Sequence, residues 1–183
     1  KATAANGQLR VFAAVTTDVV AEAMRRHDCW PVAAAALGRT MTGALLFAAN
    51  LKNKESVTIK FKGDGPLGTV TADATAEGSV RGCVDHPHVH LPLNAHGKID
   101  VGGGIGQGIL SVTRFTGLKE PVTGSVDIVS GEIADDLINY LYTSEQTPSS
   151  IGLGVLVSPE LKCLGAGGFF LQPLPGASDE VID

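Results

Sequence analysis

The stretch SVDIVSGEIADDLINYLYTSEQTPSSIGLGVLVSPELKCLGAGG, residues 125–168, decides the fold of this chain. It begins as a strand, because Val126 and Ile128 alternate with polar residues. A helix follows, because apolar residues then recur at helical spacing and form one stripe. The residues of that stripe are Ile133, Leu137, Ile138 and Leu141. Pro148 ends the helix, and two apolar segments around residues 158–160 then predict a β-hairpin of residues 151–157 and 161–166.

Acidic side chains accompany the predicted helix, and they are Glu132, Asp135, Asp136 and Glu145. The first three fall in its opening turn, where the helix dipole favours negative charge, and Ser130 or Gly131 can cap it. Glu132 and Asp136 share a helix face and are candidates for a general acid and base. We expect a solvated helix face instead, because nothing else in the sequence completes a catalytic group.

The rest of the chain alternates between strand and helix patterns. Residues 8–16 predict a strand with Leu9, Val11, Ala13 and Val15 on one face, followed by a short helix to His27. Pro31 begins a long alanine-rich helix, which we interpret as a buried core helix and not as a membrane span. Further strands are expected at residues 55–62, 69–74, 79–84, 98–101, 109–115 and 169–171, with a turn at Gly167-Gly168.

Length and composition support one domain of the α+β class, with antiparallel or mixed sheets packed against helices. The 183 residues are 44% hydrophobic, which is enough for a sizeable core. The net charge is −5 and no basic patch with interleaved aromatic residues is present, so we expect no nucleic-acid partner. Three widely separated cysteines, Cys29, Cys83 and Cys163, indicate a reducing, cytoplasmic compartment rather than a disulfide framework.

A loop rich in histidine, residues 85–97, is the first candidate site. His86, His88 and His90 share one parity, and three imidazoles on one face can hold zinc or copper. Pro87 and Pro92 disfavour a regular strand there, so we expect a solvated loop. A metal-binding protein that uses residues 86–90 is the alternative.

A glycine-rich loop, GGGIGQG at residues 102–108, is the second candidate site. It matches neither the dinucleotide pattern nor the Walker pattern, and a strand rather than a helix is expected after it. A bulged or bent strand connection is therefore expected, with a nucleotide-binding enzyme as the alternative. No G-x-S-x-G nucleophile elbow occurs, and Cys83 is expected to be a buried, inert thiol, so we predict no enzymatic activity and no catalytic residue.

Several motifs converge in order along nearly the whole chain. They are AAALGR at 34–39, GDGPLG at 63–68, GSVRG at 78–82, GKIDV at 97–101, SGEIADD at 130–136, SEQTPS at 144–149 and AGGF at 166–169. In this order the chain resembles the N-terminal domain of the heat shock protein 33 family. The resemblance implies an ATP-independent, redox-regulated holdase that binds unfolding proteins under heat and oxidative stress, and a tendency to form homodimers.

The resemblance also implies a zinc-binding redox switch, made of C-x-C and C-x-x-C pairs in a C-terminal module. Cys29, Cys83 and Cys163 match neither pair, so we expect no metal ligand and no cofactor in this chain. Ser178-Asp179-Glu180 is typical of a helix N-terminus. We therefore expect residues 1–176 to form the chaperone core and residues 177–183 to begin a helical linker towards that module. We also expect any chaperone activity of this chain to be insensitive to peroxide.

Overall fold

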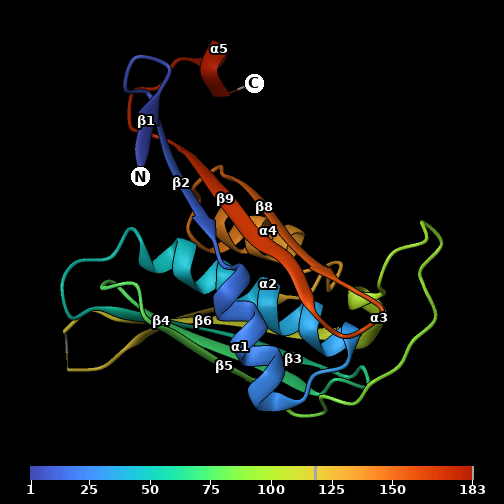
Figure 1. Ribbon diagram of the computed structural model, residues 1–183. Coiled ribbons are helices and arrows are strands. Elements are labelled where there is room, and N and C mark those ends of the chain that lie inside the picture. Colours follow the sequence, from blue (N-terminus) through green and yellow to red (C-terminus); the bar gives the residue numbers. More distant parts are fainter. Residues whose placement is uncertain (118, 183) are drawn as a thin grey trace.

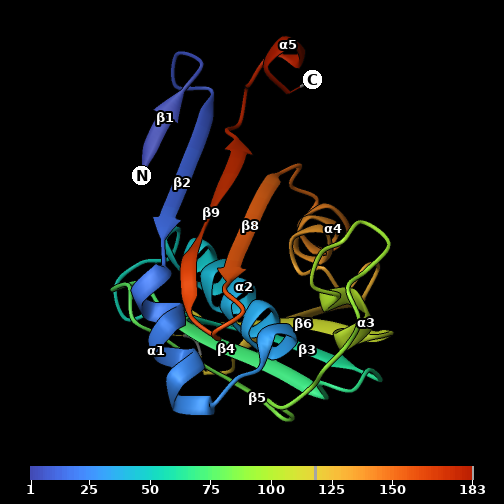
Figure 2. The ribbon, with the colours of Figure 1, turned by 45° about the vertical axis from the view of Figure 1, so that its right-hand side comes forward.

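Two antiparallel β-sheets pack against opposite sides of one buried helix, α2 (Pro31–Ala48), in the computed structural model of this protein (Figure 1). The structure describes residues 1–117 and 119–182. The architecture is therefore α+β with antiparallel sheets, as predicted. Figure 2 shows the layers from a second side, with α2 lying between the two sheets.

Helix α2 is buried because its sequence is built of small and apolar residues. Pro31 occupies its first turn, where the missing amide hydrogen is not needed. A Cβ atom at Gly38 would lie 2.8 Å from Val155 and from Val20, so this glycine lets the four-stranded sheet and α1 approach closely. By length and composition α2 is able to span a membrane, but 83% of it is buried inside the fold. This burial confirms the prediction of a core helix.

The five-stranded sheet has the strand order β5-β4-β3-β6-β7. Its strands are β3 (Ser56–Gly63), β4 (Thr69–Thr75), β5 (Val80–Val84), β6 (Gly108–Phe115) and β7 (Val122–Asp127). Apolar and polar residues alternate in β3, where Val57, Ile59 and Phe61 are fully buried while Lys60 is exposed. The strands expected at residues 55–62, 69–74 and 79–84 are confirmed, and they pair antiparallel in this order as β3, β4 and β5.

The four-stranded sheet has the strand order β1-β2-β9-β8. Its strands are β1 (Ala2–Ala4), β2 (Leu9–Val15), β8 (Ser150–Val157) and β9 (Cys163–Pro173). The hairpin of β8 and β9 is confirmed, but the expected turn at Gly167-Gly168 is wrong. Both glycines lie inside the continuous strand β9, paired with β2 on one side and β8 on the other.

The helices α1 (Thr17–His27), α3 (Val101–Ile105), α4 (Ala134–Ser144) and α5 (Asp179–Ile182) complete the fold. The predicted strand at residues 98–101 is wrong, because the chain there leads into α3. Asp100 caps this short helix by accepting a hydrogen bond from the Gly103 amide. Helix α5 begins where the capping pattern predicted, whereas the predicted end of that segment, Asp183, lies outside the described residues.

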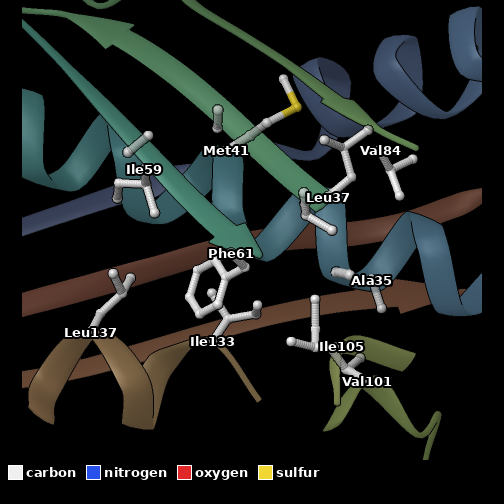
Figure 3. Close-up of a cluster of buried hydrophobic side chains, with 14 of the residues drawn as sticks. Ala35, Leu37, Met41, Ile59, Phe61, Val84, Val101, Ile105, Ile133 and Leu137 are labelled. Carbon is white, nitrogen blue, oxygen red and sulfur yellow. The ribbon is translucent and has the colours of Figure 1, made fainter. Parts of the chain in front are cut away.

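The inner faces of the two sheets form one hydrophobic core with α2. Figure 3 shows Phe61 and Ile59 of the five-stranded sheet facing Leu137 and Ile133 at the start of α4. Leu137 also lies under the position of a Cβ at Gly43 of α2, at 2.7 Å. Helix α4 therefore packs beside α2 within the core layer and not on the outer face of either sheet.

Candidate functional site

The outer face of the four-stranded sheet is apolar and carries no charge. Because side chains alternate along a strand, every second residue of β1, β2, β8 and β9 points away from α2. We call these residues the outer apolar face: Ala2, Ala4, Leu9, Val11, Ala13, Val15, Ser150, Gly152, Gly154, Leu156, Gly165, Gly167, Phe169 and Leu171. Val15 is 90% exposed, Leu156 61% and Phe169 43%.

This arrangement shows which face of β2 meets the core. Phe12 points inward, where its ring stacks on Phe170 at 6.0 Å. The row that begins with Leu9 and ends with Val15, singled out by its alternation, therefore faces outward. Exposed apolar clusters of this kind mark binding surfaces.

Glycine keeps much of the outer apolar face free of side chains. A Cβ atom at Gly154 or Gly165 would meet no other atom within 4 Å, so the fold itself has no steric need for glycine at these positions. Gly152 differs, because the Phe169 ring lies across it and would be 2.4 Å from its Cβ. Phe169 thus packs flat on the backbone of the neighbouring strand, and the surface beside it stays open.

A cavity of about 250 Å³ borders the far end of the same sheet. It is lined by Leu9 and Leu171 of the outer apolar face and by Val181 and Ile182 of α5. The Ser178 amide donates a hydrogen bond of 2.8 Å to the Gln8 side chain, which holds the start of α5 beside β2. Helix α5 therefore partly covers this end, while Val15 and Leu156 remain uncovered.

The outer face of the five-stranded sheet is mostly polar, and the exposed Ile109 and Phe115 of β6 are its large apolar side chains. It carries threonine, serine, lysine and other polar side chains at Ser56, Thr58, Lys60, Lys62, Thr69, Thr71, Asp73, Thr75, Arg81, Ser111, Thr113, Thr123, Ser125 and Asp127. Cross-strand hydrogen bonds join several of them, including one of 2.9 Å between the Thr113 and Thr123 hydroxyl groups. The two sheets therefore share one core but differ in what they offer to solvent.

The histidine loop does not bring its three imidazoles together into a site. His86, His88 and His90 are all exposed. Nε2 of His88 lies 2.8 Å from an Asp28 carboxylate oxygen, and its ring packs on Trp30 at 5.4 Å between ring centres. Within residues 1–117 and 119–182, no group of three or more His, Cys, Asp or Glu side chains is placed to hold a metal ion.

The glycine-rich segment is not the bulged connection that we expected. Residues 101–105 are helical, and amides of this segment already have protein partners. The Gly102 amide donates to Glu132 at 3.1 Å, and the Gln107 amide donates to Asp64 at 2.8 Å. These bonds tie the segment to the structure around it and leave those amides unavailable to a phosphate.

The acidic residues of the central stretch do not form the expected solvated face. Asp136 is fully buried, and its carboxylate accepts hydrogen bonds from the amides of Val129, Ser130 and Ile133. The helix therefore begins at Ala134, later than predicted, because this carboxylate organises the turn before it. Only Asp135 is exposed, as we expected for all of them.

The other two acids are paired with arginines. Glu132 lies 2.7 Å from the Arg39 guanidinium of α2. Glu145 lies 2.6 Å from Arg114, and it also accepts a hydrogen bond of 3.1 Å from the Tyr140 hydroxyl. Burial, and then the charge of Glu145, raise the pKa of Tyr140. These pairs hold α4 against α2 and β6, so they are structural contacts rather than an acid–base couple.

The three cysteines lie in different environments, and Cys83 contradicts our expectation. Cys29 is buried, which raises the pKa of its thiol to about 11, and the nearby Asp28 adds to this effect. Partial burial also raises the pKa of Cys163. Cys83 is exposed, because it lies on the outward row of edge strand β5. The described residues therefore do not fit the four-thiolate zinc site that the resemblance implies.

The structure defines a class of protein, an α+β domain with two antiparallel sheets around one buried helix. The outer face of its four-stranded sheet is apolar and uncharged. The family model described as Hsp33 protein matches residues 1–183. The chain belongs to the Hsp33 family.

Similar proteins agree with this assignment. The chain is 54% identical to proteins named 33 kDa chaperonin from Desulforamulus reducens and Bacillus licheniformis, over its whole length. It spans 62% and 63% of the lengths of these relatives. The crystal structure of the 33 kDa chaperonin (heat shock protein 33 homologue) from Thermotoga maritima matches with a TM-score of 0.90 and 44% identity. That match covers 94% of this chain and 59% of the other.

The sequence contains a signal for the outer apolar face in strand β2. Both rows of β2 are largely apolar, which is unusual for a strand with one wet face. One row had to face the core, and the larger Phe12 decides which one. The other row then has to be exposed or covered by a partner.

Proposed function

We propose that this chain is an ATP-independent holdase that binds unfolding polypeptides on the outer apolar face and prevents their aggregation. The observation that carries the proposal is the combination of Hsp33 family membership with an uncharged, exposed sheet face. Unfolding proteins expose apolar side chains, and burying them against Val15, Leu156 and Phe169 removes apolar area from water on both partners. Binding of this kind needs no nucleotide and no catalytic residue.

The test is light scattering from a thermally unfolding client, with and without stoichiometric amounts of the chain and without ATP. We expect the chain to suppress the scattering. A charge in the face should abolish suppression, so Val15→Asp and Leu156→Asp are the test variants. Both side chains are exposed, and their replacement should leave the fold intact.

Thr71→Asp is the matched control, because it places the same charge on the polar outer face, directly opposite Lys60. We expect this variant to suppress scattering as well as the unaltered chain does. Failure of the unaltered chain to suppress scattering would refute the proposed function. If all three variants lose suppression equally, the outer apolar face is not the surface that binds the client.

We further propose a cytoplasmic protein that forms homodimers and belongs to a family with a C-terminal, zinc-dependent redox switch. The family resemblance supports each of these points. Exposed strand edges at β1, β8, β5 and β7 give a chain of this kind the means to associate. Sedimentation velocity over a range of protein concentrations tests the dimer.

A further inference from the structure

The two sheets have four edge strands, and they differ in protection against pairing with another chain. Strand β1 is only three residues long and follows Lys1. Strand β5 carries Arg81, and β7 carries Asp127. Short length and charge are the usual devices that keep an edge from adding a further strand. Strand β8, with the sequence SIGLGVLV, has eight residues and neither charge nor proline.

The free edge of β8 also has unpaired backbone. In an antiparallel strand, every second residue directs its N–H and C=O groups away from the neighbouring strand. Among the described residues, no backbone hydrogen bond joins β8 to any segment other than β9. Helix α4 lies beside β8, and its Leu137 packs with Gly43 of α2 and Leu153 of β8 on the inner side of the sheet. Gly154 and Leu156 of β8 are exposed.

The side chains of β8 leave room for an incoming strand. On the outer side this strand presents Gly152 and Gly154 in succession, and a Cβ at Gly154 would meet no other atom within 4 Å. Leu156 follows on the same side and is 61% exposed. An extended chain that lies along this edge therefore contacts the backbone of Gly152 and Gly154 and then the apolar side chain of Leu156.

We propose that an extended segment of the client pairs with β8 through backbone hydrogen bonds and becomes a fifth strand of the four-stranded sheet. This inference rests on the proposed function and specifies the form in which the client is bound. Side chains at every second position of the added strand extend the outer apolar face, since alternation continues across the sheet. The occupant is therefore an unfolded segment in which apolar and polar residues alternate.

Backbone pairing explains how one surface discriminates unfolded from folded proteins. Every polypeptide carries the same N–H and C=O groups, so pairing with β8 requires no particular client sequence. A folded client has already paired these groups within its own helices and sheets, and so it offers no free strand. The apolar outer face then favours segments that belong in a hydrophobic core.

The test uses two dye-labelled peptides of the same length as β8, in which valine alternates with threonine. The second peptide carries N-methyl groups on its backbone amides, which remove the donors on both edges but keep every side chain. Fluorescence anisotropy measures binding to the unaltered chain. We expect the methylated peptide to bind roughly 10-fold more weakly or worse, because at least three backbone hydrogen bonds are lost.

Hydrogen exchange gives an independent readout on the protein. In the free chain, the amides on the open edge of β8 should exchange fast, and the unmethylated peptide should slow them. The amides of β7, the edge of the polar sheet, should be unchanged. Gly154→Lys, which adds charge to the β8 edge, should weaken the unmethylated peptide, whereas Thr123→Lys on β7 should not.

Equal affinity of the two peptides, or unchanged exchange of the β8 amides, would overturn the inference. If β8 is instead paired with a second copy of the chain, the peptides will not bind and Gly154→Lys will convert dimers to monomers. That result would also overturn it. In either case light scattering with a full-length client still measures the proposed function separately, so the two failures are distinguishable.

Discussion

The two sheets of this protein are built on one core but present opposite surfaces to solvent. Both bury valine, isoleucine and phenylalanine against α2 and its neighbours. Outside, the five-stranded sheet carries mostly hydroxyl groups and charges besides Ile109 and Phe115, and the four-stranded sheet carries glycine and exposed Val15, Leu156 and Phe169. The polar surface is what a stable antiparallel sheet needs. The apolar surface leaves Val15, Leu156 and Phe169 exposed, which is typical of a binding surface.

The largest effect is expected from the shared core. Phe61→Ala removes a fully buried ring from the five-stranded sheet and should lower the free energy of unfolding by about 4 kcal/mol. Since both sheets pack on α2, the four-stranded sheet should unfold at the same, lower denaturant concentration. Circular dichroism and hydrogen exchange of β9 amides measure this. Separate transitions for the two sheets would contradict a single cooperative core.

The next effect concerns the turn that leads from the polar sheet into α4. Asp136→Ala leaves three backbone amides without their buried acceptor and should lower stability by about 3 kcal/mol. The matched control is Asp135→Ala at the neighbouring exposed position, where the change should stay below about 0.5 kcal/mol. Urea denaturation of both variants decides the matter. Equal effects would mean that Asp136 is not the organising residue of this turn.

Exchanging residue types between the two outer faces should change stability in opposite directions. Gly154→Val adds a β-branched side chain where nothing obstructs it, and it should raise stability by about 0.5–1 kcal/mol. Thr71→Gly on the polar face should lower stability by about 1 kcal/mol. Thermal unfolding checks both values. A destabilised Gly154→Val would show that the fold does require this glycine.

The smallest effect on client suppression is expected from chemical modification of the cysteine thiols. Cys83 is exposed on the polar sheet and should react with iodoacetamide first, while Cys29 should react last. A thiol pKa raised to about 11 leaves little thiolate at neutral pH, so labelling of Cys29 should accelerate only as the pH approaches that value. Mass spectrometry follows the order. Labelling or peroxide oxidation of Cys83 should leave client suppression unchanged, and Cys83→Ser is the control.

Much of the fold was predictable because local patterns and the core agree. Alternation at Val57, Ile59 and Phe61 required one buried face, and Pro31 with the run of alanines required a buried helix. The two failures have different causes. Residues 98–101 lead into α3 because Asp100 caps that helix by accepting from the Gly103 amide, whereas Gly167-Gly168 are held in β9 by the two strands that flank it. Glycine has no strong local preference, so its neighbours in space decide.

The candidate site was the least predictable part. The motifs pointed to the Hsp33 family, but they contain mainly residues that shape turns and helix ends. The acids of the central stretch were assigned to solvent, yet Asp136 is buried and Glu132 is paired with Arg39. Cys83 was assigned to the interior, yet it is exposed. In each case the sequence identified the element correctly but not the side of it that meets the core.

The sequence by itself determined the class of the fold, the buried helix at its centre and the family, because these follow from the period of apolar residues and from the order of motifs. Only the tertiary structure decided which rows of side chains face outward. A strand such as β2 has apolar residues on both faces, and local periodicity is symmetric between them. The packing of Phe12 against Phe170 breaks that symmetry, and it leaves the row that ends at Val15 free to bind.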